Sequence, residues 1–354
     1  MKLKFLVGCY TDSENEKGLH LLEFDEENKN ITLINSHTLA NPSYLSFSTN
    51  KSIIYSVNEN HSVSDSLSAI AFDRVKLTFE TINEIDVKGS DPCFISLDSK
   101  HKHIFSANYS DGTLSCVSLH ADGSLANLVQ VIKHPTDPSD ELHPNTHMHA
   151  ALLSPDKQFL LVTNLGLDTL SLYNYQPDNH TEPLKEIPEQ VYQFPIGTGP
   201  RHLLFSSNGK FAYVVGELDG SVHVLAWDSG VLSFVQKAML MPSDFNGKNS
   251  AADIHFGADG RFIYLSNRGD ANQLISFAVN QETGELTLLQ RTATLGNGPR
   301  NFAVDPSGNY LLVANQYSNE IRLFKIDKIT GGLIDTGVSH AINNPVFVSF
   351  LKDL

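Results

Sequence analysis

The sequence predicts an all-β protein, a seven-bladed β-propeller, and three observations carry this prediction. The first is a repeat. Six times along the 354 residues, a run of the type Pro-x-x-apolar-x-apolar-Ser is followed by a polar turn and an aliphatic or aromatic run that ends in Asn or Gly. These ends fall at Asn58, Asn108, Asn164, Gly216, Asn267 and Asn315, in steps of 50, 56, 52, 51 and 48 residues. Repeats of this length and regularity are typical of propellers and solenoids.

The second observation is the strand pattern inside each repeat. The fourth copy contains four short alternating runs, GPRHLLFS, FAYVVGEL, SVHVLAW and LSFVQKAM, with turn residues between them. No long stretch of the chain has helical periodicity. Since four short antiparallel strands make one propeller blade, the pattern favours a propeller over a solenoid.

The third observation concerns the two ends of the chain. The N-terminal run FLVGCYT resembles the second run of a repeat, and the C-terminal run NPVFVSFL resembles the first. Each end therefore supplies what the other lacks, and the C-terminal run is expected to be the inner strand of a seventh blade that the N-terminus completes. A ring closed in this way leaves no open seam. We expect one propeller domain over residues 1–354.

Composition limits the class of protein. Hydrophobic residues make up 41% and charged residues 18% of the chain, and no apolar run approaches the eighteen residues of a membrane span. The formal charge of −15 argues against nucleic acid as a partner. The three cysteines, Cys9, Cys93 and Cys116, are too few for a disulfide framework, which favours a reducing, cytoplasmic location. A closed ring needs no second copy, so a monomer is the default expectation.

The seven arginines are unevenly placed in the repeats. Arg201 and Arg300 follow Gly-Pro at the start of inner strands, and Arg268 follows the end of a second strand. In an antiparallel blade these two positions lie at the same end, at one mouth of the central channel. We therefore expect the three arginines to converge there. Arg261 lies in a tight turn between an inner and a second strand and is expected on the opposite face.

Other polar residues occupy the same two positions in the repeats. Such residues commonly line propeller channels for structural reasons, and the repeated Asn can satisfy backbone groups of loops. Clustered Arg, His and Glu in a concave site also indicate a binding or catalytic site. The residues before or within inner strands are Ser43, Asp91, His147, His149, His202 and Asn301, and those at the ends of second strands are Tyr10, Glu59, Tyr109, Glu217 and Gln316.

The chemistry of this mouth suggests a small anionic ligand, because guanidinium groups pair two oxygens of a carboxylate or phosphate. Either His149 or Glu217 can serve as general base. His143, His147 and His149 have spacings compatible with a metal, but they lack an acidic ligand at a defined spacing, and we expect no metal or other cofactor. The sequence contains neither a Gly-x-Ser-x-Gly elbow nor a phosphate-binding GxxxxGK[ST] loop.

Three of the segments resemble a known family. GPRHLLFSSNGKFAYVVGEL, SAADIHFGADGRFIYLSNR and GPRNFAVDPSGNYLLVANQ are similar to signature segments of the seven-bladed propeller lactonases typified by bacterial 6-phosphogluconolactonase. The similarity covers essentially the whole chain and is strongest over residues 147–316. It implies catalytic roles for His149, Arg201, Glu217 and Arg268. Gly216 departs from the pattern, since the family usually has Asn before this Glu.

The resemblance implies hydrolysis of 6-phospho-D-glucono-1,5-lactone to 6-phosphogluconate, a step of the pentose phosphate pathway. The residues expected to bind the substrate are His147, His202, Arg300, Asn267 and Gln316. The family also includes fungal enzymes that open or close the lactone ring of carboxylated muconate, so a lactonase or cycloisomerase for another sugar or carboxylated lactone is an alternative. A second alternative is a non-catalytic binding scaffold, which predicts an apolar patch at the rim. Trp227 does not supply one, because its third-strand pattern places it between blades.

Overall fold

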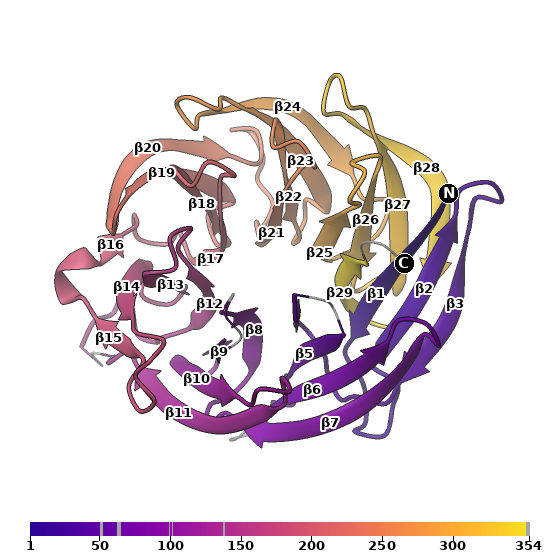
Figure 1. Ribbon diagram of the computed structural model, residues 1–354. Helices are drawn as coiled ribbons and strands as arrows, with labels where there is room; N and C mark the ends of the chain where they lie inside the picture. Colours follow the sequence, from indigo (N-terminus) through magenta and orange to yellow (C-terminus); the bar gives the residue numbers. More distant parts are fainter. Residues whose placement is uncertain (50–51, 62–64, 99, 101, 137–138, 352–354) are drawn as a thin grey trace.

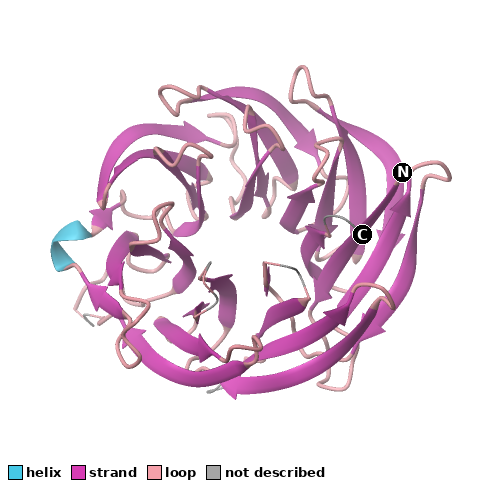
Figure 2. Cartoon of the chain, in the orientation of Figure 1, coloured by secondary structure: helices cyan, strands magenta, loops and turns pink. Residues whose placement is uncertain are grey.

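Seven β-sheets form a closed ring in the computed structural model, which describes residues 1–49, 52–61, 65–98, 100, 102–136 and 139–351 (Figure 1). Strands account for almost all regular structure, and the described residues contain one short 3₁₀ helix, η1 (Pro188–Gln190), seen in Figure 2. The predicted all-β, seven-bladed propeller is therefore confirmed. Parts of the polar turns in the first two repeats, residues 50–51, 99 and 101, lie outside the described residues.

The ring closes in the way that the two ends of the sequence predict. Strand β29 (Pro345–Phe350) is the inner strand of a blade whose other strands are β1 (Lys2–Cys9), β2 (Leu19–Asp25) and β3 (Asn30–His37). Strands β1 and β29 pair antiparallel, with Phe5 opposite Phe350 and Val7 opposite Val348. This pairing joins the first and last parts of the chain, completes the four-stranded blade and closes the ring.

The other blades are consecutive antiparallel meanders. The second blade comprises β4 (Leu45–Phe47), β5 (Ile53–Asn58), β6 (Ser66–Asp73) and β7 (Thr78–Asp86). The third comprises β8 (Pro92–Leu97), β9 (His103–Asn108), β10 (Thr113–Leu119) and β11 (Leu125–Lys133). The fifth blade comprises β17 (Pro200–Phe205), β18 (Phe211–Gly216), β19 (Ser221–Asp228) and β20 (Val231–Met239). The sixth comprises β21 (Ala251–Phe256), β22 (Phe262–Asn267), β23 (Gln273–Val279) and β24 (Leu286–Ala293). The seventh comprises β25 (Pro299–Val304), β26 (Tyr310–Asn315), β27 (Glu320–Ile326) and β28 (Leu333–Ala341).

The fourth blade differs from the four-strand pattern at its outer edge. Its first strands are β12 (Met148–Leu153), β13 (Phe159–Asn164) and β14 (Thr169–Tyr175), but the outer strand is divided into β15 (Leu184–Glu186) and β16 (Tyr192–Gln193), which both pair with β14. The helix η1 separates them, with Pro188 at its first position. Because proline has no N–H to donate to a ladder, it interrupts the outer strand here.

Apolar residues between neighbouring blades form the core. Trp227 on β19 is 8% exposed and lies edge-on to Phe159 of the preceding blade and Phe205 of its own, at ring-centroid distances of 5.7 and 5.6 Å. The prediction that this tryptophan packs between blades is confirmed. In the described residues, no helix is long and apolar enough to cross a membrane.

In the fourth and sixth blades, the repeated Asn at the end of the second strand ties that strand to the loop entering its inner strand. Asn164 Oδ1 accepts the backbone N–H of His147 at 3.0 Å, and its Nδ2 donates to Thr146 Oγ1 at 2.7 Å. Asn267 makes the equivalent bond to Ser250 N at 3.0 Å. Both Asn side chains are buried, so the structural interpretation of this repeated residue holds, and the bonds fix one end of the channel.

Candidate active site

A cavity of about 300 Å³ opens at the mouth where the sequence predicts that the arginines converge. Arg201, Arg268 and Arg300 all line it, whereas Arg261 lies in the exposed turn between β21 and β22, paired with Asp259. The convergence of three arginines from three successive blades is therefore observed. The full lining is Glu59, His61, Asp91, Cys93, Tyr109, Ser110, His149, Arg201, Glu217, Arg268 and Arg300.

Irregular pairing at the start of the inner strands orients the lining side chains. The register between β12 and β13 shifts between Met148 and Ala150, which brackets His149. Equivalent shifts bracket Cys93 on β8, Arg201 with His202 on β17, and Arg300 on β25. Such bulges turn side chains away from the strict alternation of a strand. The same irregularity in successive blades thus supplies several cavity residues.

Glu217 lies between two of the arginines. Its Oε2 is 3.0 Å from Arg201 Nε, and its Oε1 is 2.9 Å from Arg268 Nη2. Ser250 Oγ also donates to Oε1, at 3.2 Å. Burial by itself raises the pKa of Glu217, but Arg268, Arg201 and Arg300 outweigh burial and lower the pKa below its ordinary value. Glu217 is therefore ionised at neutral pH and holds both guanidinium groups in place.

Arg300 is held by a second acidic group through a tyrosine. Its Nη2 donates to Tyr10 Oη at 2.8 Å, and this hydroxyl donates to Glu59 Oε2 at 2.7 Å. The guanidinium also lies over the Tyr10 ring, 5.3 Å from its centroid. Burial lowers the pKa of Arg300, but Tyr10, Glu59 and Glu217 more than offset it and raise the pKa above its ordinary value. Arg300 is a permanent, oriented cation.

His149 is the neutral imidazole of the cavity. Its side chain is buried, and Nδ1 has no hydrogen-bond partner in the described part of the chain. Burial and then the positive charge of Arg201 lower its pKa well below the ordinary value. The ring is edge-on to Tyr109 and to His202, at centroid distances of 5.7 and 5.2 Å. The imidazole is therefore unprotonated at neutral pH and has a lone pair that can accept a proton, while burial and the neighbouring cations keep its basicity low.

The nine site residues predicted from the sequence separate into two groups. His149, Arg201, Glu217, Arg268 and Arg300 line the cavity, whereas His147, His202, Asn267 and Gln316 do not. His147 stacks on Tyr109 at 4.4 Å and donates from Nδ1 to the Tyr109 carbonyl at 2.9 Å. Asn267 makes the local bonds described above, and Gln316 is buried at the end of β26. His202 contacts Arg201 from behind the cavity.

Sequence reasoning did not single out three lining residues, His61, Cys93 and Ser110. His61 Nδ1 lies 2.7 Å from Asp91 Oδ1, and Ser110 Oγ donates to the other oxygen of that carboxylate. The sequence could have identified Ser110 and Cys93, because Ser110 follows Tyr109 and Cys93 comes two residues after Asp91. Tyr109 and Asp91 were already predicted to lie at the mouth of the channel. His61 lies beyond the strand pattern, in the loop after Glu59, and nothing in the repeat identifies it.

The departure at Gly216 is compensated locally. A Cβ at this position would come within 2.5 Å of Asp219 Oδ1 and 2.7 Å of Ser221 Oγ. These two side chains fill the space and bond to each other at 2.6 Å. Backbone bonds on either side, from Glu217 N to Gly199 O at 2.8 Å and from Ala251 N to Glu217 O at 3.1 Å, hold the next residue. Glu217 is therefore anchored without an asparagine before it.

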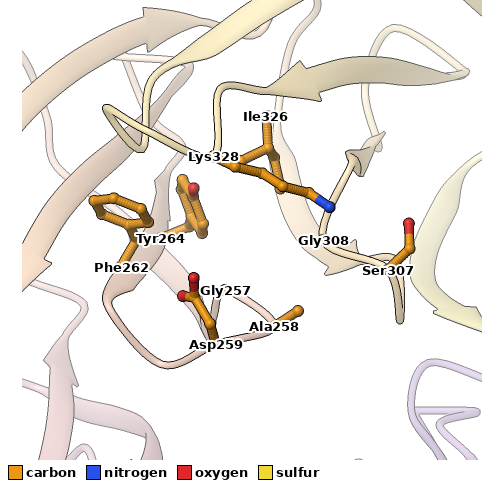
Figure 3. Close-up of a pocket in the computed structure, with 9 residues that line it drawn as sticks. All are labelled: Gly257, Ala258, Asp259, Phe262, Tyr264, Ser307, Gly308, Ile326 and Lys328. Atoms are coloured by element: carbon orange, nitrogen blue, oxygen red, sulfur yellow. The ribbon is translucent and has the colours of Figure 1, made fainter.

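A second cavity, of about 200 Å³, lies on the opposite face, among the turns between inner and second strands (Figure 3). Its charged side chains are Asp259 and Lys328, and Asp259 is already paired with Arg261 at 2.7 Å. It lacks the arginine cluster of the first cavity. Within the described residues, no group of three His, Cys, Asp or Glu side chains is arranged to hold a metal ion.

Comparisons with known proteins agree with this architecture. Residues 4–350 match the family described as "Lactonase, 7-bladed beta-propeller". The chain is 31% identical over 351 residues to a 6-phosphogluconolactonase of Bacillus subtilis (strain 168), with 98% of each chain covered. It is also 31% identical over 337 residues to a 6-phosphogluconolactonase of Formosa agariphila, which covers 92% of this chain and 93% of that relative.

Solved structures give the same result. The structure of a periplasmic gluconolactonase of Pseudomonas aeruginosa is similar with a TM-score of 0.94 and 34% sequence identity, over 99% of both chains. Because the family match spans nearly the whole sequence and the relatives are covered almost end to end, the chain belongs to the seven-bladed β-propeller lactonase family.

Proposed function

We propose that this protein is a lactone hydrolase that converts 6-phospho-D-glucono-1,5-lactone to 6-phosphogluconate. The observation that carries the proposal is the convergence of three oriented arginines and one neutral histidine on a single cavity of about 300 Å³. The two relatives named as 6-phosphogluconolactonases support the choice of substrate. Cationic donors are suited to the oxygen that becomes negative during attack on an ester carbonyl.

In the proposed mechanism, His149 accepts a proton from water as the water oxygen attacks the lactone carbonyl carbon. Arg201 and Arg268, held by Glu217, stabilise the negative charge that develops on the carbonyl oxygen. The bond from this carbon to the ring oxygen then breaks, and protonated His149 returns the proton to the departing oxygen. Glu217 is not the base in this scheme, because two guanidinium groups already occupy its oxygens.

Arg300 is the proposed anchor for the phosphate. Within the described residues its Nη2 donates one hydrogen bond, to Tyr10, so the second N–H of Nη2 and the N–H groups of Nε and Nη1 remain as donors for a ligand. A guanidinium fork pairs two phosphate oxygens at once. The Tyr10 and Glu59 contacts orient this fork before the substrate arrives.

A second candidate substrate is the unphosphorylated gluconolactone. The specific observation in its favour is the charge balance of the lining, where the three arginines face the three carboxylates of Glu59, Asp91 and Glu217. A site with little net charge can bind an uncharged sugar lactone. The similarity to a periplasmic gluconolactonase points in the same direction.

The test is the hydrolysis of both lactones, freshly prepared, by purified protein, with and without EDTA. A coupled 6-phosphogluconate dehydrogenase assay follows the phosphorylated substrate, and acid release in a weakly buffered indicator follows the other. We expect turnover of the phosphorylated lactone that chelator does not change, because each of the three cavity carboxylates is engaged by protein side chains: Glu217 by Arg, Glu59 by Tyr, and Asp91 by His and Ser. Preference for the unphosphorylated lactone would select the second candidate.

Variants assign the residues in the same assay. His149→Gln and Arg201→Ala are each expected to lower kcat by about 100-fold or more. Arg261→Ala is the matched control, because it removes an arginine from the opposite face. If His149→Gln retains full turnover, the proposed base is wrong, and if no lactone is hydrolysed above the spontaneous rate, the enzymatic proposal fails.

We further propose that residues 1–354 act as one propeller domain and as a monomer in the cytoplasm. All three cysteines are free and buried, which is consistent with a reducing compartment. The ring has its inner strands paired within its own blades, so assembly is not needed to complete it. Light scattering on the eluted protein tests the monomer, one cooperative unfolding transition tests the single domain, and cell fractionation tests the location.

A further inference from the structure

A buried histidine and aspartate lie directly behind Arg201. His202 follows it on β17, and Asp253 lies on the neighbouring inner strand β21 (Figure 1). Arg201 Nη1 lies 3.1 Å from His202 Nε2, and His202 Nδ1 lies 2.7 Å from Asp253 Oδ1. The three side chains are at most 5% exposed. They form a continuous hydrogen-bonded chain that leads away from the cavity.

The donors and acceptors of this chain permit one arrangement. Arginine has only N–H donors, so His202 Nε2 must be the acceptor of the bond to Arg201. The other ring nitrogen, Nδ1, then carries the hydrogen and donates to the Asp253 carboxylate. Burial, followed by the charge of Arg201, lowers the pKa of His202 to about 4, which agrees with a neutral ring. The carboxylate thus selects the tautomer that is able to hold the arginine.

Asp253 is itself fixed from the other side. Its Oδ2 accepts His255 Nε2 at 2.8 Å and Asn301 Nδ2 at 2.5 Å, and Asn301 Oδ1 accepts the backbone N–H of Val348 at 2.7 Å. Burial opposes ionisation, but His255 and His202 outweigh it and lower the pKa of Asp253 below its ordinary value. The carboxylate is therefore a charged, immobile acceptor.

We propose that His202 and Asp253 are positioning residues that aim the Arg201 guanidinium at the substrate carbonyl, a proposal that rests on the lactonase function above. Nη1 of Arg201 is held by His202 and by the Ala252 carbonyl at 2.5 Å, and Nε lies against Glu217. In the described part of the chain, Nη2 makes no hydrogen bond or ion pair, which leaves it as the group offered to the substrate. Neither His202 nor Asp253 lines the cavity, so neither acts on the substrate directly.

Two substitutions of His202 separate this role from simple packing. In His202→Gln, the terminal amide reaches the place of Nε2 and offers Arg201 an acceptor, while the bond to Asp253 is lost. In His202→Asn, the shorter amide replaces Nδ1 and donates to Asp253, while the acceptor for Arg201 is lost. Both variants lose the ring contacts to Tyr44 and Phe94, so they share the packing defect.

We expect His202→Asn to lower kcat by about 100-fold with little change in KM, since small misplacement of a group acting in the transition state costs about this factor. His202→Gln should recover most of kcat although its melting temperature is no higher. Asp253→Asn should resemble His202→Asn, because an amide can present N–H to Nδ1 and reverse the tautomer. His223→Gln is the control and should keep wild-type kcat, because it replaces a buried histidine of β19 that does not line the cavity.

A spectroscopic measurement tests the arrangement without relying on activity. Long-range ¹H–¹⁵N spectra of protein labelled at histidine, with His202 assigned by its loss in His202→Asn, should show a neutral ring protonated at Nδ1 at pH 7.5. Protonation at Nε2 or at both nitrogens would overturn the proposal. So would kcat values that simply follow the melting temperatures of the two variants. If wild type hydrolyses no lactone, the functional proposal fails separately, and the tautomer still reports whether His202 can hold Arg201.

Discussion

Replacing Glu217 by Gln removes one charge from the centre of the arginine cluster while keeping the size of the side chain. The carboxylate faces Arg201 and Arg268 at 3.0 and 2.9 Å, and its side chain is 18% exposed. A glutamine can accept a bond from only one arginine and turns an N–H group toward the other. The substitution therefore leaves a buried guanidinium facing a donor.

The expected loss of stability follows from this geometry. Breaking a buried ion pair by removing one partner costs about 3–5 kcal/mol, and the partial exposure of Glu217 places this case near the lower value, about 3 kcal/mol. A chain of 354 residues has an unfolding entropy of about 0.7 kcal/mol per kelvin near its melting temperature. The melting temperature should therefore fall by about 4 °C. Because both arginines lose their anchor, kcat should fall by about 100-fold or more.

The assay combines differential scanning calorimetry with turnover of the phosphorylated lactone. Asp259→Asn is the matched control, since it neutralises the carboxylate of an arginine pair in which both side chains are about half exposed. Exposed pairs contribute about 0–1 kcal/mol, so its melting temperature should change by about 1 °C or less. Equal shifts in the two variants, or a Glu217→Gln protein with unchanged kcat, would refute the reasoning that Glu217 holds the catalytic arginines.

Three further predictions concern other parts of the molecule. Tyr10→Phe removes the hydroxyl between Arg300 and Glu59 and should raise KM for the phosphorylated lactone by about tenfold. KM for the unphosphorylated lactone should not change, and equal effects on both substrates would show that Arg300 does not bind the phosphate. Burial lowers the pKa of His223 to about 4, so between pH 6.5 and 4 the unfolded chain binds a proton that the folded protein does not. The free energy of unfolding should therefore decrease as the pH is lowered, by up to about 1.4 kcal/mol per pH unit, and urea denaturation should show a shallower pH dependence in His223→Phe. Burial raises the pKa of all three thiols, that of Cys9 to about 12. Ellman's reagent should therefore label Cys9, Cys93 and Cys116 only when the protein unfolds, and rapid labelling of the native protein would contradict their burial.

The location of much of the candidate site can be predicted from the spacing of the sequence repeats. The positions before inner strands and after second strands converge for every blade, so Arg201, Arg268 and Arg300 could be placed together and Arg261 apart from them. The repeat spacing could not predict which of these side chains contact one another at the mouth of the channel. Sequence reasoning left His149 and Glu217 as equal candidates for the base, and only the two arginine contacts of Glu217 distinguish them. Nor did it separate cavity residues from supporting ones, as His202 and Asn267 show.

Sequence periodicity is enough to predict the number of blades, the closure of the ring and the mouth at which the charged residues gather. These depend on the period of the repeat and on alternating apolar residues, which are local properties of the chain. Which side chains face the cavity depends on the packed fold, because bulges at the starts of inner strands reorient them. The packed fold also sets their charge states. A contact such as Asp253 with His202 joins residues about fifty positions apart on neighbouring blades, and the burial and neighbouring charges that set their protonation exist only when the blades pack together.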